Sequence, residues 1–216
     1  HIAEFKKPMI LSTGGGTMED VNRAYDAVMP INQQLCILQC TAGYPADFDQ
    51  LNLSVITTFR ERFPNLTIGL SSHDNGIAMA VAAYMLGARV IEKHFTLNHT
   101  WKGTDHAFSL EPIGFRKMVR DLERVKVAIG DGVKQTYESE KNPIIKMGKK
   151  LVAARDLPAG YTIRREDIAL KSPGDGLPPY ELDKVIGRVT RQELKEDDDI
   201  AYEVLNGAED WAEAAS

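Results

Sequence analysis

Two histidines carry the clearest chemical signal in the sequence. His73 lies in the polar run Ser71–Asp74 and His94 ends the polar run Glu92–His94, and each run comes directly after a short segment that reads as a strand. If these segments are successive parallel strands, both imidazoles lie at the carboxyl edge of one sheet, where α/β proteins bind their ligands. Two neighbouring imidazoles with open positions beside them suit a divalent metal ion that also binds an oxygen-rich substrate. One interpretation of the pair is therefore a metal site.

The alternative interpretation is that both histidines are structural and hydrogen-bonded within the fold. His99 and His106, in the loop that follows the last predicted strand, compete with them as metal ligands. Asp105 lies in the same loop, within the run Trp101–His106, which combines aromatic, cationic and acidic side chains. Such a mixture is common in loops that cover a substrate, and an exposed loop with one anchoring tryptophan is the simpler alternative.

Hydroxyl groups and glycines follow two other predicted strands. Ser12 and Thr13 precede Gly14–Gly16, and Thr41 lies three residues before Tyr44. Glycines and hydroxyls that lead into a helix N-terminus suit a phosphate or a carboxylate, since free backbone N–H groups and the helix dipole both favour an anion. A flexible loop between a strand and a helix is the alternative here too.

The elements that must position these residues alternate regularly over residues 8–130. Short apolar runs predict strands, and apolar residues at helical spacing between them predict helices. The predicted strands are 8–13, 35–40, 67–70 and 89–91, and the predicted helices are 18–28, 51–63, 77–86 and a last one that ends at Gly130. Four successive βα units predict an α/β fold with a parallel sheet, because each parallel pair needs a crossover helix. The sheet could be open and doubly wound, or half of a (β/α)₈ barrel.

The pattern changes after this region. Residues 134–149 are polar and predict a linker, whereas 150–205 consist of short apolar runs between turn signals, typical of a small β-rich domain. Residues 154–163 and 191–200 share one layout, a short helical turn followed by a tight turn and an entering strand. The domain is therefore expected to be pseudo-symmetric. Residues 206–216 form an acidic tail.

Composition narrows the class of protein. The 216 residues include 26 basic and 31 acidic side chains, which give a net charge of −5 and no basic footprint for nucleic acid or anionic membrane. No run approaches the roughly 18 apolar residues that a membrane span needs. Cys36 and Cys40 share one apolar run and are expected to be buried thiols on one face of a strand. A cytoplasmic enzyme is the expected class.

A series of short motifs spans residues 8–130. They are Leu11-Ser12-Thr13-Gly14, Gln39-Cys40-Thr41 with Tyr44-Pro45, Gly69-Leu70-Ser71-Ser72-His73, Ile91-Glu92-Lys93-His94-Phe95-Thr96, Gly103-Thr104-Asp105-His106 and Ser109-Leu110-Glu111-Pro112. In sequence and in order these motifs resemble the sialic acid (N-acetylneuraminate) synthase family. Residues 150–205 resemble the antifreeze-protein-like SAF (β-clip) domain that follows the barrel in those enzymes.

The resemblance implies a fold and a reaction. It implies the carboxy-terminal half of a TIM (β/α)₈ barrel over 1–133, a linker over 134–149 and a SAF domain over 150–205. The implied reaction condenses phosphoenolpyruvate with an N-acylated hexosamine, N-acetylmannosamine or its 6-phosphate, to a nine-carbon 2-keto acid and phosphate. The implied cofactor is Mn²⁺ or Mg²⁺, bound by residues that match His73 and His94. The implied substrate contacts match Ser12 and Ser71 for phosphoenolpyruvate, and Tyr44 and Asp105 for the sugar.

The chain also departs from the family pattern. Ala42 stands where many bacterial members have asparagine, and Ser172 stands where members often have an arginine that reaches the sugar of the partner subunit, with Lys171 as a substitute cation. The resemblance implies a homodimer in which the SAF domain covers the partner's strand ends. It also implies four further βα units before residue 1, without which the chain is expected to be inactive. The alternatives are a legionaminate, pseudaminate or spore-coat polysaccharide type of synthase, and a non-catalytic sugar- or anion-binding module.

Overall fold

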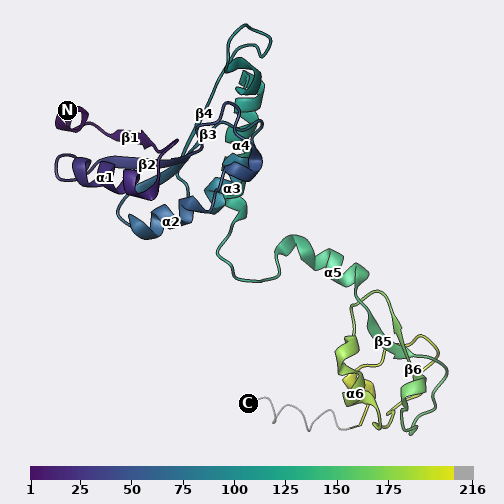
Figure 1. Ribbon diagram of the computed structural model, residues 1–216. Helices are drawn as coiled ribbons and strands as arrows, with labels where there is room; N and C mark the ends of the chain where they lie inside the picture. Colours follow the sequence, from purple (N-terminus) through teal and green to yellow (C-terminus); the bar gives the residue numbers. More distant parts are fainter. Residues whose placement is uncertain (207–216) are drawn as a thin grey trace. The chain divides into compact units, whose positions relative to one another are not determined.

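The computed structural model describes residues 1–206, which form two compact units (Figure 1). The N-terminal unit comprises His1–Gly132 and the C-terminal unit begins at Val133. The last part of the predicted acidic tail, residues 207–216, lies outside the described residues. Within the described residues, no helix combines the length and the apolar character needed to cross a membrane.

The N-terminal unit is built on one parallel sheet, as the alternation predicts. Its strands lie in the order of the sequence, β1-β2-β3-β4, and every neighbouring pair is parallel. The strands are β1 (Met9–Ser12), β2 (Leu35–Cys40), β3 (Thr67–Ser72) and β4 (Val90–Lys93), and the helices are α1 (Met18–Val28), α2 (Val55–Arg62), α3 (Ala78–Met85) and α4 (Pro112–Ala128). Sequential order fits one wall of a barrel, whereas a doubly wound sheet changes direction. The sheet is a curled half-barrel of four strands.

The two faces of this sheet have different neighbours. On one face, Ile37, Ile68 and Leu70 pack against Ile56 and Phe59 of α2, and this cluster is the core of the unit. We call this the helix-covered face. Side chains alternate between the two faces along each strand, so the intervening residues lie on the other face, which we call the open face. There Ser71 of β3 lies beside Glu92 of β4. Ile10 of β1 is 59% exposed on the open face.

The element boundaries agree with the prediction at α1 and differ at α2, which begins at Val55 and not at Leu51, and at two strand ends. Thr17 and Asp20 form a capping box at the start of α1, which fixes that helix at the predicted residue. Strands β3 and β4 each continue two residues beyond the predicted strands, to Ser72 and Lys93. The polar side chains before each histidine are therefore part of the sheet.

The C-terminal unit has a separate hydrophobic core around a small antiparallel sheet. Its elements are α5 (Lys141–Met147), β5 (Lys150–Ala153), β6 (Ile168–Lys171) and α6 (Leu182–Val185), and its core is formed by Leu151, Ala153, Leu157, Ile163, Ile168, Val185, Leu194, Ile200 and Leu205. The repeat in the sequence is visible as a pairing between equivalent leucines. Leu157 and Leu194 each donate a backbone N–H to the other's carbonyl, at 2.7 and 2.9 Å. The expected pseudo-symmetry is present at this pair.

The polar segment 134–149 is not an extended linker throughout. Its second half contains α5, in whose first turn Pro143 is tolerated. The backbone N–H of Gly174 donates to the carbonyl of Ile145 at 2.7 Å, so α5 packs against the loop that follows β6. Helix α5 therefore belongs to the C-terminal unit, and the connecting stretch is shorter than the sequence suggests.

Candidate functional site

His73 and His94 lie side by side at the carboxyl ends of β3 and β4. Their ring centroids are 5.0 Å apart, and the rings are nearly perpendicular. The register explains this contact. Ser71 pairs with Glu92, and each histidine lies two residues further along, on the same side as that pair. We call His73 and His94 the histidine pair.

His73 is held on three sides by neighbouring groups. It is only 5% exposed, and its Nδ1 lies 2.9 Å from the carbonyl oxygen of Thr41. Tyr44 stacks on the imidazole at a centroid distance of 4.3 Å. The carbonyl of His73 accepts a hydrogen bond from the backbone N–H of Ala46. The Thr41 carbonyl is an acceptor, so Nδ1 carries the proton and Nε2 is the nitrogen available to a ligand.

His94 is more open and has an acidic neighbour. Its side chain is 27% exposed, its Nδ1 lies 3.6 Å from Oδ2 of Asp105, and its ring contacts Phe108. Burial lowers the pKa of His94, as does His73, whereas Asp105 and Glu92 act in the opposite direction. The lowered pKa favours the neutral imidazole, which is the form that binds metal ions.

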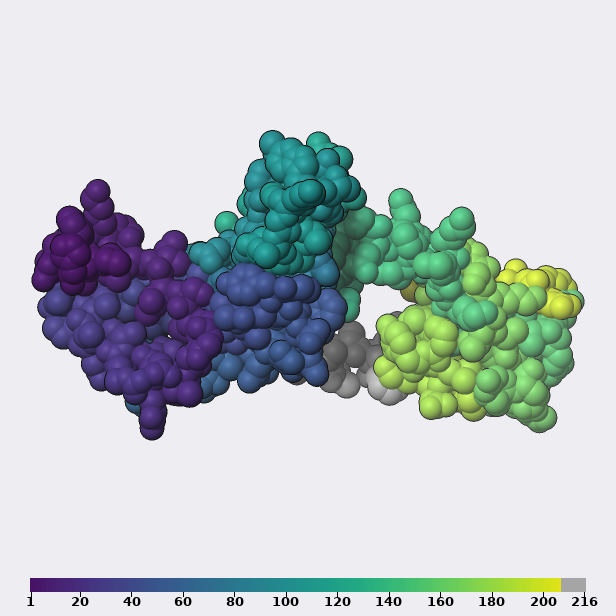
Figure 2. Space-filling view, turned by 45° about the horizontal axis from the view of Figure 1, so that its top comes forward, coloured from purple at the N-terminus to yellow at the C-terminus, as the bar shows by residue number. Residues whose placement is uncertain are grey.

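The competing histidines are engaged inside their own loop. Nδ1 of His106 lies 2.7 Å from the hydroxyl of Thr96, and Nε2 of His99 lies 2.6 Å from the carbonyl of Ser109. Figure 2 shows this part of the chain, in teal, as a raised lobe of the N-terminal unit. Both imidazoles stabilise the loop, which leaves His73 and His94 as the pair at the strand ends.

The donor set of the histidine pair suits a metal ion with open coordination positions. Among residues 1–206, no three or more histidine, cysteine, aspartate or glutamate side chains are grouped as a ready-made metal site. The pair itself provides two imidazole nitrogens, and Asp105 stands beside one of them. Water or substrate oxygens would complete the coordination, as in sites where a metal both binds and polarises a substrate.

The other predicted contact residues have varied surroundings. The hydroxyl of Ser71 donates to Glu92 at 2.7 Å, and Ser12 is exposed at the end of β1. The hydroxyl of Thr41 donates to the carbonyl of Gln50 at 2.9 Å, so this residue faces the histidine pair through its backbone. Lys171 lies on β6 in the C-terminal unit, where its ammonium pairs with Asp197.

Several charged and aromatic residues near the histidine pair have no role that the sequence predicts. Glu92 lies on the open face, Phe108 packs against His94, and Lys93 and Asp74 form a buried ion pair on the helix-covered side. The alternation of side chains along a strand was the signal available in the sequence. Each histidine has a charged neighbour in the chain whose side chain points to the opposite face. A charged residue that points towards a helix-covered face needs a partner.

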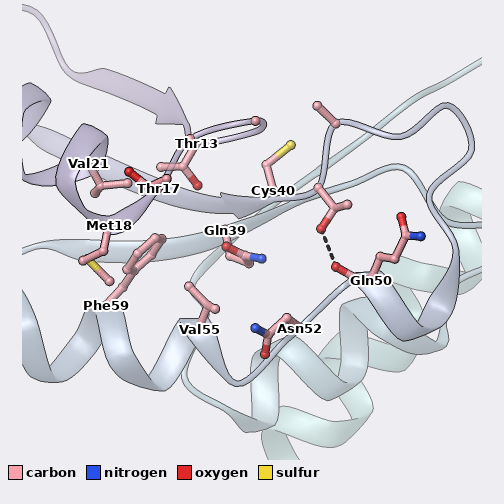
Figure 3. Close-up of a pocket in the computed structure, with 14 residues that line it drawn as sticks. Thr13, Thr17, Met18, Val21, Gln39, Cys40, Gln50, Asn52, Val55 and Phe59 are labelled. Atoms are coloured by element: carbon pink, nitrogen blue, oxygen red, sulfur yellow. Dashed lines mark hydrogen bonds between the residues drawn. The ribbon is translucent and has the colours of Figure 1, made fainter.

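A separate pocket of about 440 Å³ opens between the carboxyl ends of β1 and β2 and the helices α1 and α2 (Figure 3). Thr13, Thr17, Gln39 and Asn52 provide polar groups, and Phe59 forms part of its apolar wall. Neither member of the histidine pair lines it. The amide of Gln39 donates to the carbonyl of Leu51, so one polar group in the pocket is already bonded within the fold.

Family models divide the chain at the same place as the structure. The NeuB family model matches residues 1–134, and the SAF domain model matches residues 150–203. The chain belongs to the NeuB family, the sialic acid synthases, and carries a SAF domain. The family assignment agrees with the parallel half-barrel and with the separate β-rich unit.

Named relatives of this NeuB-family chain are synthases. It is 39% identical over 201 residues to the human N-acetylneuraminate-9-phosphate synthase, covering 93% of this chain and 56% of that protein. It is 34% identical over 200 residues to the N,N'-diacetyllegionaminic acid synthase of Campylobacter jejuni, covering 91% of this chain and 60% of the relative. The chain therefore spans just over half the length of these relatives.

A solved structure shares the architecture. The spore coat polysaccharide biosynthesis protein spsE of Bacillus subtilis aligns with a TM-score of 0.56 and 29% identity, over 94% of this chain and 62% of that one. The proteins that this chain resembles are thus two named synthases and a spore coat polysaccharide biosynthesis protein.

Proposed function

We propose that this chain is the carboxy-terminal portion of a nonulosonate synthase with a TIM-barrel catalytic domain. The reaction condenses phosphoenolpyruvate with an N-acylated hexosamine, and a water molecule adds as phosphate is released. The observation that carries the proposal is the contact between His73 and His94 at the carboxyl ends of adjacent parallel strands, with Asp105 beside His94. The same edge is where α/β barrels bind their substrates.

In this proposal His73 and His94 hold Mn²⁺ or Mg²⁺ through imidazole nitrogens. When bound, the divalent ion supplies Lewis-acid polarisation of the sugar's aldehyde oxygen. The Thr41 carbonyl keeps the proton of His73 on Nδ1, and Tyr44 fixes the plane of its ring by stacking. Both contacts restrict the ring to one orientation, which is the contribution expected of groups behind a metal ligand.

Asp105, Tyr44 and the serines would orient the substrates. Asp105 is half-exposed beside His94 and can accept hydrogen bonds from sugar hydroxyls. Tyr44 presents an exposed ring and hydroxyl above the histidine pair. Ser12 and Ser71 stand at strand ends where phosphoenolpyruvate is expected, and the Ser71 hydroxyl is oriented by Glu92. A sugar that lacks the matching hydroxyl would leave these groups unpaired once the substrate covers them, and such contacts discriminate between sugars.

N-acetylmannosamine 6-phosphate is the sugar we favour. The observation behind this choice is the name and 39% identity of the human relative, an N-acetylneuraminate-9-phosphate synthase. A legionaminic acid synthase at 34% identity makes a related diacetylated sugar the second candidate.

The assembly proposed is a cytoplasmic homodimer in which the C-terminal unit of one subunit covers the strand ends of the other. A separate core in each unit supports an exchange of this kind, since neither core depends on residues of the other unit. Lys171 would supply a cation to the partner's substrate, because Ser172 stands where family members often have an arginine. On this proposal the 216 residues alone have no condensation activity.

The test is a condensation assay on the native protein, purified at the length its cells produce. Phosphoenolpyruvate and Mn²⁺ are supplied with N-acetylmannosamine, its 6-phosphate or a diacetylated hexosamine, and the products are identified by mass spectrometry. We expect a nine-carbon keto acid 9-phosphate and free phosphate. His73→Gln should abolish the product and His99→Gln, the matched control, should retain it. Product from none of the sugars, or full activity in His73→Gln, contradicts the proposal.

A further inference from the structure

A buried ion pair lies directly behind the histidine pair. Nζ of Lys93 is 3.0 Å from Oδ1 of Asp74, and the two side chains are 2% and 1% exposed. Lys93 also donates to the hydroxyl of Ser72, at 3.3 Å, and to the backbone carbonyl of Asp74. An ammonium group has three donors, so all three are used within the segment 72–74. Lys93 thus fastens the end of β4 to the segment that contains His73.

The alternation of side chains along β3 and β4 relates the ion pair to the histidine pair. Ser72 and Lys93 are register partners, and their side chains point to the helix-covered side, opposite to Ser71 and Glu92. Asp74 follows His73 directly, and Lys93 precedes His94 directly. Each member of the ion pair is therefore one peptide bond away from one member of the histidine pair. The ion pair lies on one side of the sheet edge, and the two rings lie on the other.

Stability alone is a weak reason for such a pair. Removing two charges from water is costly, and well-packed uncharged residues of similar volume commonly replace a buried ion pair without loss of stability. Oδ2 of Asp74 is buried and accepts no hydrogen bond within the described residues, so the carboxylate is not fully compensated. The arrangement is better explained by the geometry that it imposes.

We propose that Lys93 and Asp74 are positioning residues that set the spacing and orientation of His73 and His94 from the opposite face of the sheet. This inference rests on the proposed function for its metal, but not for its geometry. Neither residue touches the metal or the substrate. The effect on binding is indirect, through the two rings.

The experiment compares variants of the 216-residue chain by NMR of labelled histidines. The main variant is Lys93→Met with Asp74→Asn, which removes both charges together and so leaves no uncompensated charge in the interior. The matched control is Arg155→Met with Asp167→Asn in the C-terminal unit, where Asp167 is fully buried and 2.7 Å from Arg155. Two quantities are measured, the nuclear Overhauser effect between the rings of His73 and His94 without metal, and the Mn²⁺ affinity from line broadening.

The double variant at the sheet edge should keep a folded spectrum but lose the ring-to-ring effect. Its Mn²⁺ affinity should fall about 10- to 100-fold, the loss typical of residues that orient metal ligands. The control should leave both quantities unchanged. If the double variant does not fold, Ser72→Ala decides. It removes one acceptor of Lys93 and one donor to Asp74 while both charges stay in place, and a smaller loss in the same direction is expected.

Two results separate this inference from the proposed function. An unchanged ring-to-ring effect in the folded variants overturns the positioning role, whatever the metal does. Absence of Mn²⁺ broadening at either histidine in the unmodified chain contradicts the metal site, while the ring-to-ring effect still tests the positioning role by itself.

Discussion

His94 lies between groups that shift its pKa in opposite directions. Burial and His73 lower the pKa, and the carboxylate of Asp105, 3.6 Å from Nδ1, raises it. The net effect favours the neutral imidazole of His94, and the carboxylate of Asp105 lies beside it. A divalent cation placed at His94 would gain from that carboxylate without competing with a proton.

Removing the charge of Asp105 tests this balance. Asp105→Asn keeps the size of the side chain and takes away the influence that raises the pKa, so the pKa of His94 should fall further. An NMR titration of the five histidines measures it, with His99 as an internal reference. A rise, or no change, would show that Asp105 does not interact with His94 in solution. For the native protein, the proposed function predicts that the same substitution raises KM for the sugar more than KM for phosphoenolpyruvate.

At this scale the sequence predicts the location of the site better than the role of each group. The histidine pair was predictable because each histidine follows a strand, and parallel strands end at one edge. The contribution of Thr41 through its carbonyl was not, because the identity of a residue says nothing about its backbone partner. The pairing of Lys93 with Asp74 required the register, which only the three-dimensional structure provides.

At the scale of elements, Gly69 controls how closely β3 fits between its neighbours. A Cβ at this position would lie 2.4 Å from Cδ2 of Leu38 and 2.4 Å from the carbonyl oxygen of Val90. Leu38 is fully buried, and Val90 presents backbone there, so neither neighbour can move away cheaply.

Gly69→Ala should therefore destabilise the N-terminal unit by about 1–3 kcal/mol, the usual cost of overpacking a core. Gly114→Ala is the matched control. Its Cβ would meet Leu110 at an ordinary 3.4 Å inside α4, where alanine is favoured over glycine by up to about 1 kcal/mol. Urea unfolding of both variants measures the difference. Equal stability of the two would mean that the sheet is looser at Gly69 than described.

Tyr202 gives the C-terminal unit a pH-dependent contribution. Its hydroxyl donates to Oε2 of Glu181 at 2.5 Å, and burial together with this carboxylate raises the pKa of Tyr202 to about 12. The unfolded value is about 10. The neutral phenol is thus favoured in the folded state, and the stability it contributes is complete below pH 10 and is lost as the pH rises through 12.

Tyr202→Phe should cost about 1.5–3 kcal/mol near pH 8, the usual contribution of a hydrogen bond to a charged acceptor. The variant should also lose less stability than the unmodified chain between pH 10 and 12. Thermal unfolding over that range provides the measurement, and parallel pH profiles for the two proteins would contradict the raised pKa.

The element boundaries show where local sequence is sufficient. Helix α1 begins at the predicted residue because its capping box is local. Helix α5 was not predicted because its segment is polar. Its position depends on a backbone hydrogen bond from Gly174, almost 30 residues away, to the carbonyl of Ile145. Long-range contacts of this kind are not encoded in the composition of a segment.

At the scale of the whole molecule, the chain consists of two units that each bury a core of their own. The family models match the same two regions. Residues 133–206 produced alone should therefore fold, and their amide spectrum should overlay that of the same residues in the 216-residue chain. A collapsed or widely shifted spectrum would show that the C-terminal unit depends on the half-barrel.

A Mn²⁺ titration of the 216-residue chain, followed by NMR of its histidines, tests most directly whether His73 and His94 form the proposed metal site at the strand ends. Mn²⁺ broadens nearby signals strongly, so even weak binding to two imidazoles is visible. We expect the signals of His73 and His94 to broaden first and together while those of His99 and His106 stay sharp. His73→Gln should remove the effect at His94. Preferential broadening of His99 or His106, or no broadening of the pair, would contradict the proposed metal site.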